Sequence, residues 1–154
     1  MLLREEVFRL AELIGALQLQ AYSAFNLSMS HILLGEIDDA ESWCRRGFPL
    51  ARRLGWAEER VGLSIFVLGC CATRRRDLTL GATLLGAFDY WESRRPGHSN
   101  VHWTPLEIQL RETTREVLIR ALGEADYLAS SAHGENLSYD QAVRLALKGL
   151  QPEL

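Results

Sequence analysis

Residues that could bind a metal ion are scattered along the chain at spacings that form no known ligand set. His98 and His102 lie four residues apart, but a zinc site needs about four convergent ligands, and no C-x2-C pair supplies the others. Cys70 and Cys71 are adjacent, so on a helix they would point about 100° apart. Buried free thiols fit this spacing better than chelation does. We expect neither a bound metal nor a cofactor.

The motifs of common enzyme classes are also absent from the sequence. There is no G-x-S-x-G nucleophile turn and no G-x-x-x-x-G-K-[ST] phosphate loop. Three adjacent acidic pairs fall near expected helix starts, where carboxylates offset the helix dipole. They are Glu5-Glu6, Asp38-Asp39 and Glu58-Glu59. The sequence therefore predicts a protein that is not an enzyme.

Paired arginines form a basic stripe in the sequence. Arg45-Arg46 is followed seven residues later by Arg52-Arg53, which places both pairs on one face of a helix. The stripe, together with the run 74–76, suits a phosphate or an acidic partner, although a solvated outer face is the simpler reading. No aromatic residues interleave with these arginines and the net charge is −3, so we expect no direct binding to nucleic acid.

Length and composition indicate one globular domain. The chain has 154 residues, of which 47% are hydrophobic and 24% charged, and no apolar run approaches the roughly 18–20 residues that span a membrane. Acidic residues directly after the first leucines argue against a signal peptide, and three cysteines form no even disulfide framework. We expect a cytoplasmic protein. Lys148 is the only lysine among 17 basic residues, a bias typical of GC-rich bacterial genomes.

Apolar residues recur at helical period along nearly the whole chain, which predicts an all-α fold. The expected N-terminal helices are 2–14, 17–34, 38–54, 57–75 and 78–94. When the sequence is shifted by 41 residues, Phe25 falls on Phe66 and Leu27 on Leu68, as in stacked helical hairpins of an α-solenoid. Asp38, with Glu41 three residues on, and Asp77 are the expected N-caps of the second helix of each hairpin.

The repeat pattern ends after residue 95. Residues 96–100 have the composition of a loop, and Thr104 with Glu107 then forms a capping box around Pro105. Ser138 and Gln141 form a second capping box before the last helix. We therefore divide the single structural domain into helical repeats over 1–95 and a loop with C-terminal capping helices over 96–154.

A series of short motifs occurs in order along the second half of the chain: Leu84-Leu85-Gly86-Ala87, Pro105, Leu122-Gly123, Gly134, Leu137-Ser138, Ala142 and Leu145-Ala146-Leu147. With these motifs the chain resembles the C-terminal tetratricopeptide-like region of bacterial STAND-class and LuxR-type ATP-dependent transcriptional regulators, and of related adenylate cyclases. Three positions depart from the pattern: Ser131 stands where the family often has Trp, Glu135 where it has Arg, and Arg76 where it has Gly. The resemblance implies the sensor or interaction arm of a multidomain regulator.

In tetratricopeptide hairpins the first helix of each pair lines a concave groove, and this register predicts a groove for a protein partner. Its expected lining is Tyr22, Phe25, Met29, Leu33, Leu63, Phe66, Cys70 and Arg74. Exposed, these apolar side chains would favour association with a partner or a symmetric homodimer. The other possibility is that they pack as ordinary core.

Two functions follow from this reading. The first is a non-catalytic protein–protein interaction or sensor arm of a bacterial signal-transduction or transcriptional regulator, which docks a protein partner or the remainder of that regulator. The second is a small-molecule effector-binding domain of such a regulator. An open, continuous groove indicates the first function, and an enclosed pocket of a few hundred cubic ångströms indicates the second.

Overall fold

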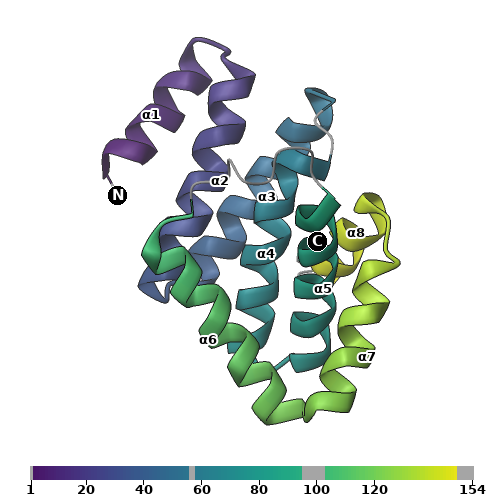
Figure 1. The fold of residues 1–154 in the computed structure, drawn as a ribbon. Helices are drawn as coiled ribbons and strands as arrows, with labels where there is room; N and C mark the ends of the chain where they lie inside the picture. The colour runs from purple at the N-terminus through teal and green to yellow at the C-terminus, as the bar shows by residue number, and fades with distance from the viewer. Residues whose placement is uncertain (1, 56–57, 95–102, 149–154) are drawn as a thin grey trace.

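The computed structural model of the chain describes residues 2–55, 58–94 and 103–148. These ranges contain eight α-helices and no strand, which confirms the all-α prediction (Figure 1). The helices are α1 (Leu2–Leu13), α2 (Leu17–Leu34), α3 (Ile37–Arg53), α4 (Glu58–Arg74), α5 (Leu78–Arg94), α6 (Pro105–Leu122), α7 (Glu124–Glu135) and α8 (Tyr139–Lys148). The predicted loop 96–100, which contains His98, lies outside the described residues, and so does His102. No helix in the described part is long and apolar enough to cross a membrane.

The turns after α2 and after α4 share one geometry, at positions 41 residues apart. Gly35 ends α2 with φ 81° and Arg76 follows α4 with φ 69°, so both residues adopt the left-handed conformation. The amide of Glu36 donates to the His31 carbonyl at 2.9 Å, and the amide of Asp77 donates to the Ala72 carbonyl at 2.9 Å. Each hydrogen bond closes a helix C-terminus in the manner of a Schellman motif. The sequence register therefore corresponds to a repeated local structure.

Helix α4 is the central element of the fold, since α2, α3, α5, α6 and α8 all pack against it. Most of its side chains after Gly62 are buried, including those of Ile65 and Phe66. Its approach to α5 is close because small residues face each other: a Cβ on Gly81 would lie 3.2 Å from the Gly69 carbonyl oxygen. The two helices thus form a tightly packed hairpin.

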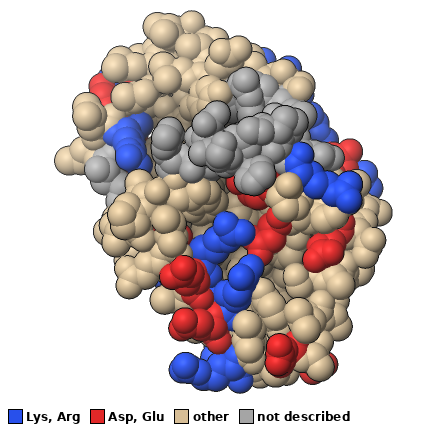
Figure 2. Space-filling view, in the orientation of Figure 1, with Lys and Arg blue, Asp and Glu red and all other residues tan. Residues whose placement is uncertain are grey.

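The C-terminal helices pack back on α4 and α5. Both predicted capping boxes are present: the Thr104 amide donates to Glu107 Oε2 at 2.7 Å, and the Ser138 amide donates to Gln141 Oε1 at 2.8 Å. Arg111 and Arg115 of α6 pair with Asp89 of α5, the second at 2.8 Å. Figure 2 shows blue and red side chains side by side on this face of the molecule. Ion pairs as well as apolar contacts hold this C-terminal segment in place.

Candidate ligand-binding site

The chain's own helix α6 and the preceding Trp103 cover part of the predicted groove. Of its eight expected lining residues, Phe25, Met29, Phe66 and Cys70 are buried, Leu33 and Leu63 are partly buried, and Tyr22 and Arg74 are exposed. The Phe66 ring packs against Trp103, which precedes α6, and the hydroxyl of Thr114 in α6 donates to Cys70 Sγ at 3.6 Å. The expectation that all eight line an open surface is corrected, since the four buried side chains belong to the core. Trp103 and α6 cover Phe66 and Cys70, whereas Phe25 packs on Phe48 of α3.

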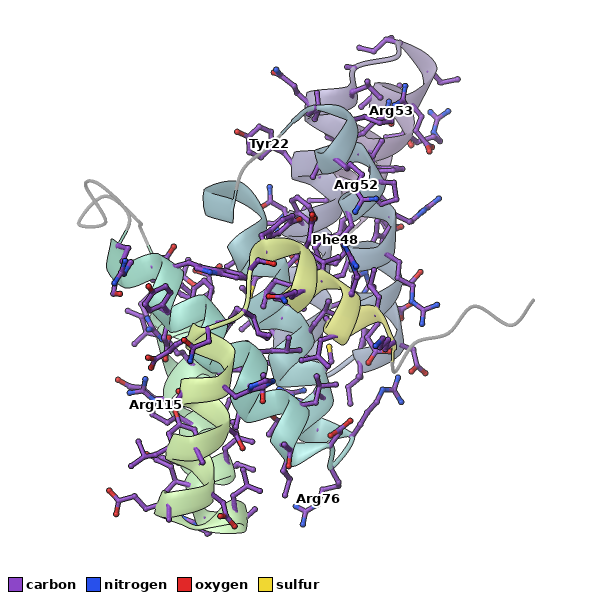
Figure 3. All side chains as sticks on the ribbon, turned by 90° about the vertical axis from the view of Figure 1, so that its right-hand side faces the viewer. Tyr22, Phe48, Arg52, Arg53, Arg76 and Arg115 are labelled. Atoms are coloured by element: carbon purple, nitrogen blue, oxygen red, sulfur yellow. The ribbon has the colours of Figure 1, made fainter. Side chains whose placement is uncertain are left out.

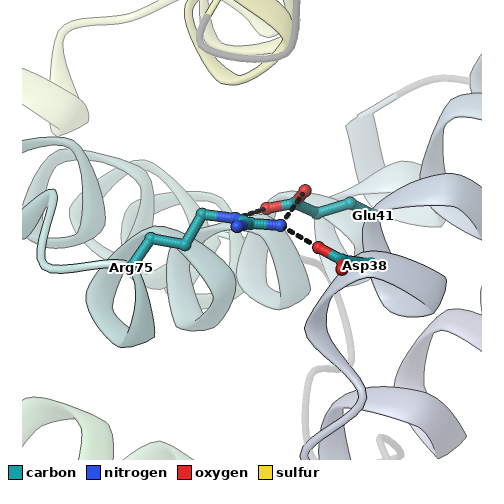
Figure 4. A network of polar contacts seen from close by, with 3 residues as sticks. All are labelled: Asp38, Glu41 and Arg75. Carbon is teal, nitrogen blue, oxygen red and sulfur yellow. Dashed lines mark hydrogen bonds and ion pairs between the residues drawn. The ribbon is translucent and has the colours of Figure 1, made fainter.

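Within the arginine run 74–76, Arg75 is used inside the molecule, whereas Arg74 and Arg76 are exposed. Arg75 donates to both carboxylate oxygens of Glu41, at 2.8 and 3.0 Å, and to Asp38 (Figure 4). Asp38 and Glu41 were expected to cap α3, but that helix begins at Ile37, after Glu36, and Glu36 makes no side-chain cap. The two acids instead join α3 to the end of α4. The other expected cap is correct, since Asp77 accepts from the Leu80 amide at 3.4 Å.

A cleft lies between α3 and α8, with a volume of about 690 Å³. Its lining is Arg45, Phe48, Pro49, Arg52, Arg53, Gly55, Tyr139, Asp140, Val143 and Leu147. Figure 3 shows Phe48 beside the yellow helix α8, with Arg52 above it and Arg53 farther away toward the top of the view. Phe48 and Val143 are buried, so the cleft has an apolar floor. We refer to this set of residues as the α3–α8 cleft.

Three arginines and one aspartate give the α3–α8 cleft a formal charge of +2. The guanidinium of Arg52 lies 3.9 Å from Asp140, and both side chains are largely exposed, which makes the pair weak. Arg45 and Arg53 form no ion pair with any other residue that the structure describes. Burial raises the pKa of the Tyr139 phenol, which therefore stays neutral and able to donate a hydrogen bond. These groups suit an anionic ligand.

The sequence contained part of the signal for this cleft. The stripe of Arg45, Arg52 and Arg53 was visible at helical spacing, and Phe48 with Pro49 lies on the same face of α3. The contribution of α8 to the cleft was not visible in the sequence. Helical periodicity shows which face of a helix is apolar, but it does not show which distant helix packs near that face. The cleft exists only because α8 returns to α3.

Sequence reasoning also missed a small polar group around the α2–α3 turn. Within the described residues, His31, Glu36 and Asp39 bring ligand-type atoms within 4.8 Å of one another. The Nδ1 atom of the buried His31 lies 2.7 Å from Glu36 Oε2, whereas its Nε2 atom is buried without a hydrogen-bond partner. The two carboxylates are exposed, and the pairing with Glu36 accounts for the position of the imidazole. We assign this group a structural role in the turn.

Comparisons of the chain with protein-family models, with curated proteins and with solved structures found no match.

Proposed function

We propose that this chain is a non-catalytic sensor arm of a bacterial signal-transduction or transcriptional regulator, and that it binds a small effector in the α3–α8 cleft. The observation that carries the proposal is a half-open cleft of about 690 Å³ that combines an apolar floor with Arg45 and Arg53, neither of which pairs with an acid among the described residues. Cavities of roughly 300–1,000 Å³ with a few placed polar groups are the usual size for small-molecule sites. The buried free cysteines Cys44, Cys70 and Cys71 are consistent with a location in the reducing environment of the cytoplasm.

The repeated turn geometry supports a tetratricopeptide-like packing for α2 to α5. The left-handed residues Gly35 and Arg76 lie 41 residues apart, and the same 41-residue shift relates Phe25 to Phe66, both buried. Recurrence of both a turn and a core position is the expected property of stacked helical hairpins. This packing is the basis for assigning the chain to the arm of a regulator.

The two functions expected from the sequence differ in the shape of the site that they need. A protein-docking groove along α2 and α4 requires an open lining, and the burial of Phe25, Met29 and Phe66 argues against docking at that place. The α3–α8 cleft has the dimensions of an effector site. The small-molecule reading is therefore the one we favour, with a protein partner as the second reading.

The cleft's chemistry defines the ligand class. Guanidinium groups bind carboxylates and phosphates through paired, charge-assisted hydrogen bonds. Phe48, Val143 and Leu147 offer an apolar surface beside these groups. The ligand that satisfies both parts is an organic anion with an apolar body.

The proposal is tested by calorimetric titration with decanoate, and with decanol as the uncharged ligand of equal chain length. Decanoate should bind, and decanol should bind at least about tenfold more weakly, because a hydrogen bond to a charged group contributes roughly 1.5–3 kcal/mol. The double variant Arg45→Gln/Arg53→Gln should remove most of the preference for the anion. The matched control is Arg120→Gln, a charge removal on the exposed surface of α6. Equal binding of both ligands, or an equal effect of the control, would contradict the proposal.

A further inference from the structure

Helix α1 presents an apolar face that no other described part of the chain covers. Its apolar members are Leu2, Leu3, Leu10, Leu13 and Ile14, which we call the α1 face; their exposed fractions run from 46% to 84%. The opposite side of the helix is packed. There the Phe8 ring lies 5.0 Å from Trp43 of α3, and Ala11 is fully buried.

The α1 face is a continuous stripe. Residues that are 7 or 11 positions apart return to nearly the same side of an α-helix. Leu3, Leu10 and Ile14 have this spacing, as do Leu2 and Leu13. Four large apolar side chains on one short helix, with Ile14 in the turn that follows it, exceed the scattered single residues that a monomer's surface normally carries.

We propose that the α1 face binds the α1 face of a second copy of this chain, with the two helices antiparallel about a two-fold axis. The two ends of the stripe are alike, with Leu2 and Leu3 at one end and Leu13 and Ile14 at the other. An antiparallel pairing therefore places Leu2 and Leu3 against the C-terminal pair of the second copy. A single self-complementary surface of this kind closes a dimer.

The charged residues of the stripe fit the same arrangement. Glu6 and Arg9 lie on either side of the helix midpoint, and within one chain Arg9 Nε donates to Glu6 Oε2 at 2.9 Å. In the antiparallel dimer Glu6 of each copy lies within one residue of the position opposite Arg9 of the other. Both ion pairs form together, whereas a parallel arrangement brings like charges side by side.

The size of the surface sets the strength that we expect. A helix of 12 residues is about 18 Å long, so one face of it buries less than the roughly 800 Å² per partner of a stable interface. The dimer is accordingly expected to exchange with monomer and to have a dissociation constant in the micromolar range or weaker.

The experiment is sedimentation equilibrium of the full chain from low-micromolar to near-millimolar concentration. The unchanged protein should move from monomer to dimer, and Leu3→Glu/Leu13→Glu should raise the dissociation constant at least about tenfold. Both positions are at least 70% exposed, so helical content should be retained. The matched control is Leu106→Glu/Leu128→Glu, two exposed leucines on α6 and α7, which should leave the dimer unchanged.

A charge exchange tests the two-fold arrangement independently of folding. Glu6→Arg and Arg9→Glu should each weaken the homodimer, and an equal mixture of the two variants should associate about as strongly as the unchanged chain. A chain that stays monomeric at near-millimolar concentration overturns the proposal and leaves the α1 face to another polypeptide segment. A dimer that the α1 substitutions leave intact, or that the α6–α7 control breaks, also overturns it.

Discussion

The ring of Trp103 stands nearly perpendicular to the ring of Phe66, with the centroids 5.4 Å apart and an interplanar angle of 89°. The ring of Trp103 also packs on the ring of Phe88, with the centroids 5.7 Å apart. This single side chain therefore contacts both α4 and α5. This edge-to-face cluster explains why Phe66 is core. A segment distant in sequence thus covers the hairpin of α4 and α5 at this place.

Trp103→Ala should destabilise the chain by roughly 2 kcal/mol, somewhat less than the 3–5 kcal/mol typical of a fully buried Trp, because this ring is only partly buried. Urea denaturation measures the change. Leu106→Ala is the control, since Leu106 is exposed at the start of α6, three residues after Trp103, and its loss should change stability by less than about 0.5 kcal/mol. Equal effects of the two substitutions would show that Trp103 is not part of the core.

Substitutions at the equivalent left-handed positions of the two hairpin turns should change the stability of the chain in opposite directions. Arg76 adopts a left-handed conformation that costs a residue with a Cβ roughly 1–2 kcal/mol, so Arg76→Gly should stabilise the chain by up to about 1 kcal/mol after the added entropy of glycine. Gly35 holds the equivalent position with φ 81°, and Gly35→Ala should destabilise the chain by a similar amount. Thermal unfolding of both variants checks the pair. A loss of stability in Arg76→Gly would mean that contacts of the arginine outweigh its backbone strain.

The local structure was predictable from sequence because it depends on neighbouring residues. Helical period fixed the first five helices to within one residue at each end, and both capping boxes lay in the predicted places. The groove was not predictable in the same way. Whether Phe66 is exposed depends on where α6 returns, which is a tertiary contact that a helical pattern does not encode. The Arg75 network, which joins residues 34 and 37 positions apart, was missed for the same reason.

The contact between α5 and α7 leaves no room for a side chain at Gly134. A Cβ there would collide with the Thr83 carbonyl oxygen and lie 2.8 Å from the Ala87 amide nitrogen, so Gly134→Ala should force α7 away from α5 and destabilise the chain by roughly 1–3 kcal/mol. Gly62→Ala is the matched control within α4. Its Cβ would meet Phe88 at an ordinary 3.6 Å, and better helix propensity should stabilise the chain by up to about 1 kcal/mol. Chemical denaturation of both variants distinguishes a steric effect from a propensity effect, and a stabilised Gly134→Ala would show that the helices have room to separate.

The buried thiols make stability sensitive to alkaline pH. Burial raises the pKa of Cys44 and of Cys70 from 9.0 to about 12, and it raises the pKa of Cys71 as well. Because the folded state holds these protons more tightly than the unfolded state does, the stability that they contribute is fully present below pH 9 and is lost as the pH rises from 9 toward 12. Each buried thiol should therefore cost on the order of 1 kcal/mol of unfolding free energy at pH 10. Urea denaturation at pH 8, 9 and 10 measures the loss, and Cys70→Ala should show a shallower decline than the unchanged chain, whatever its stability at pH 8. A decline of the same slope would assign the alkaline sensitivity to groups other than this thiol.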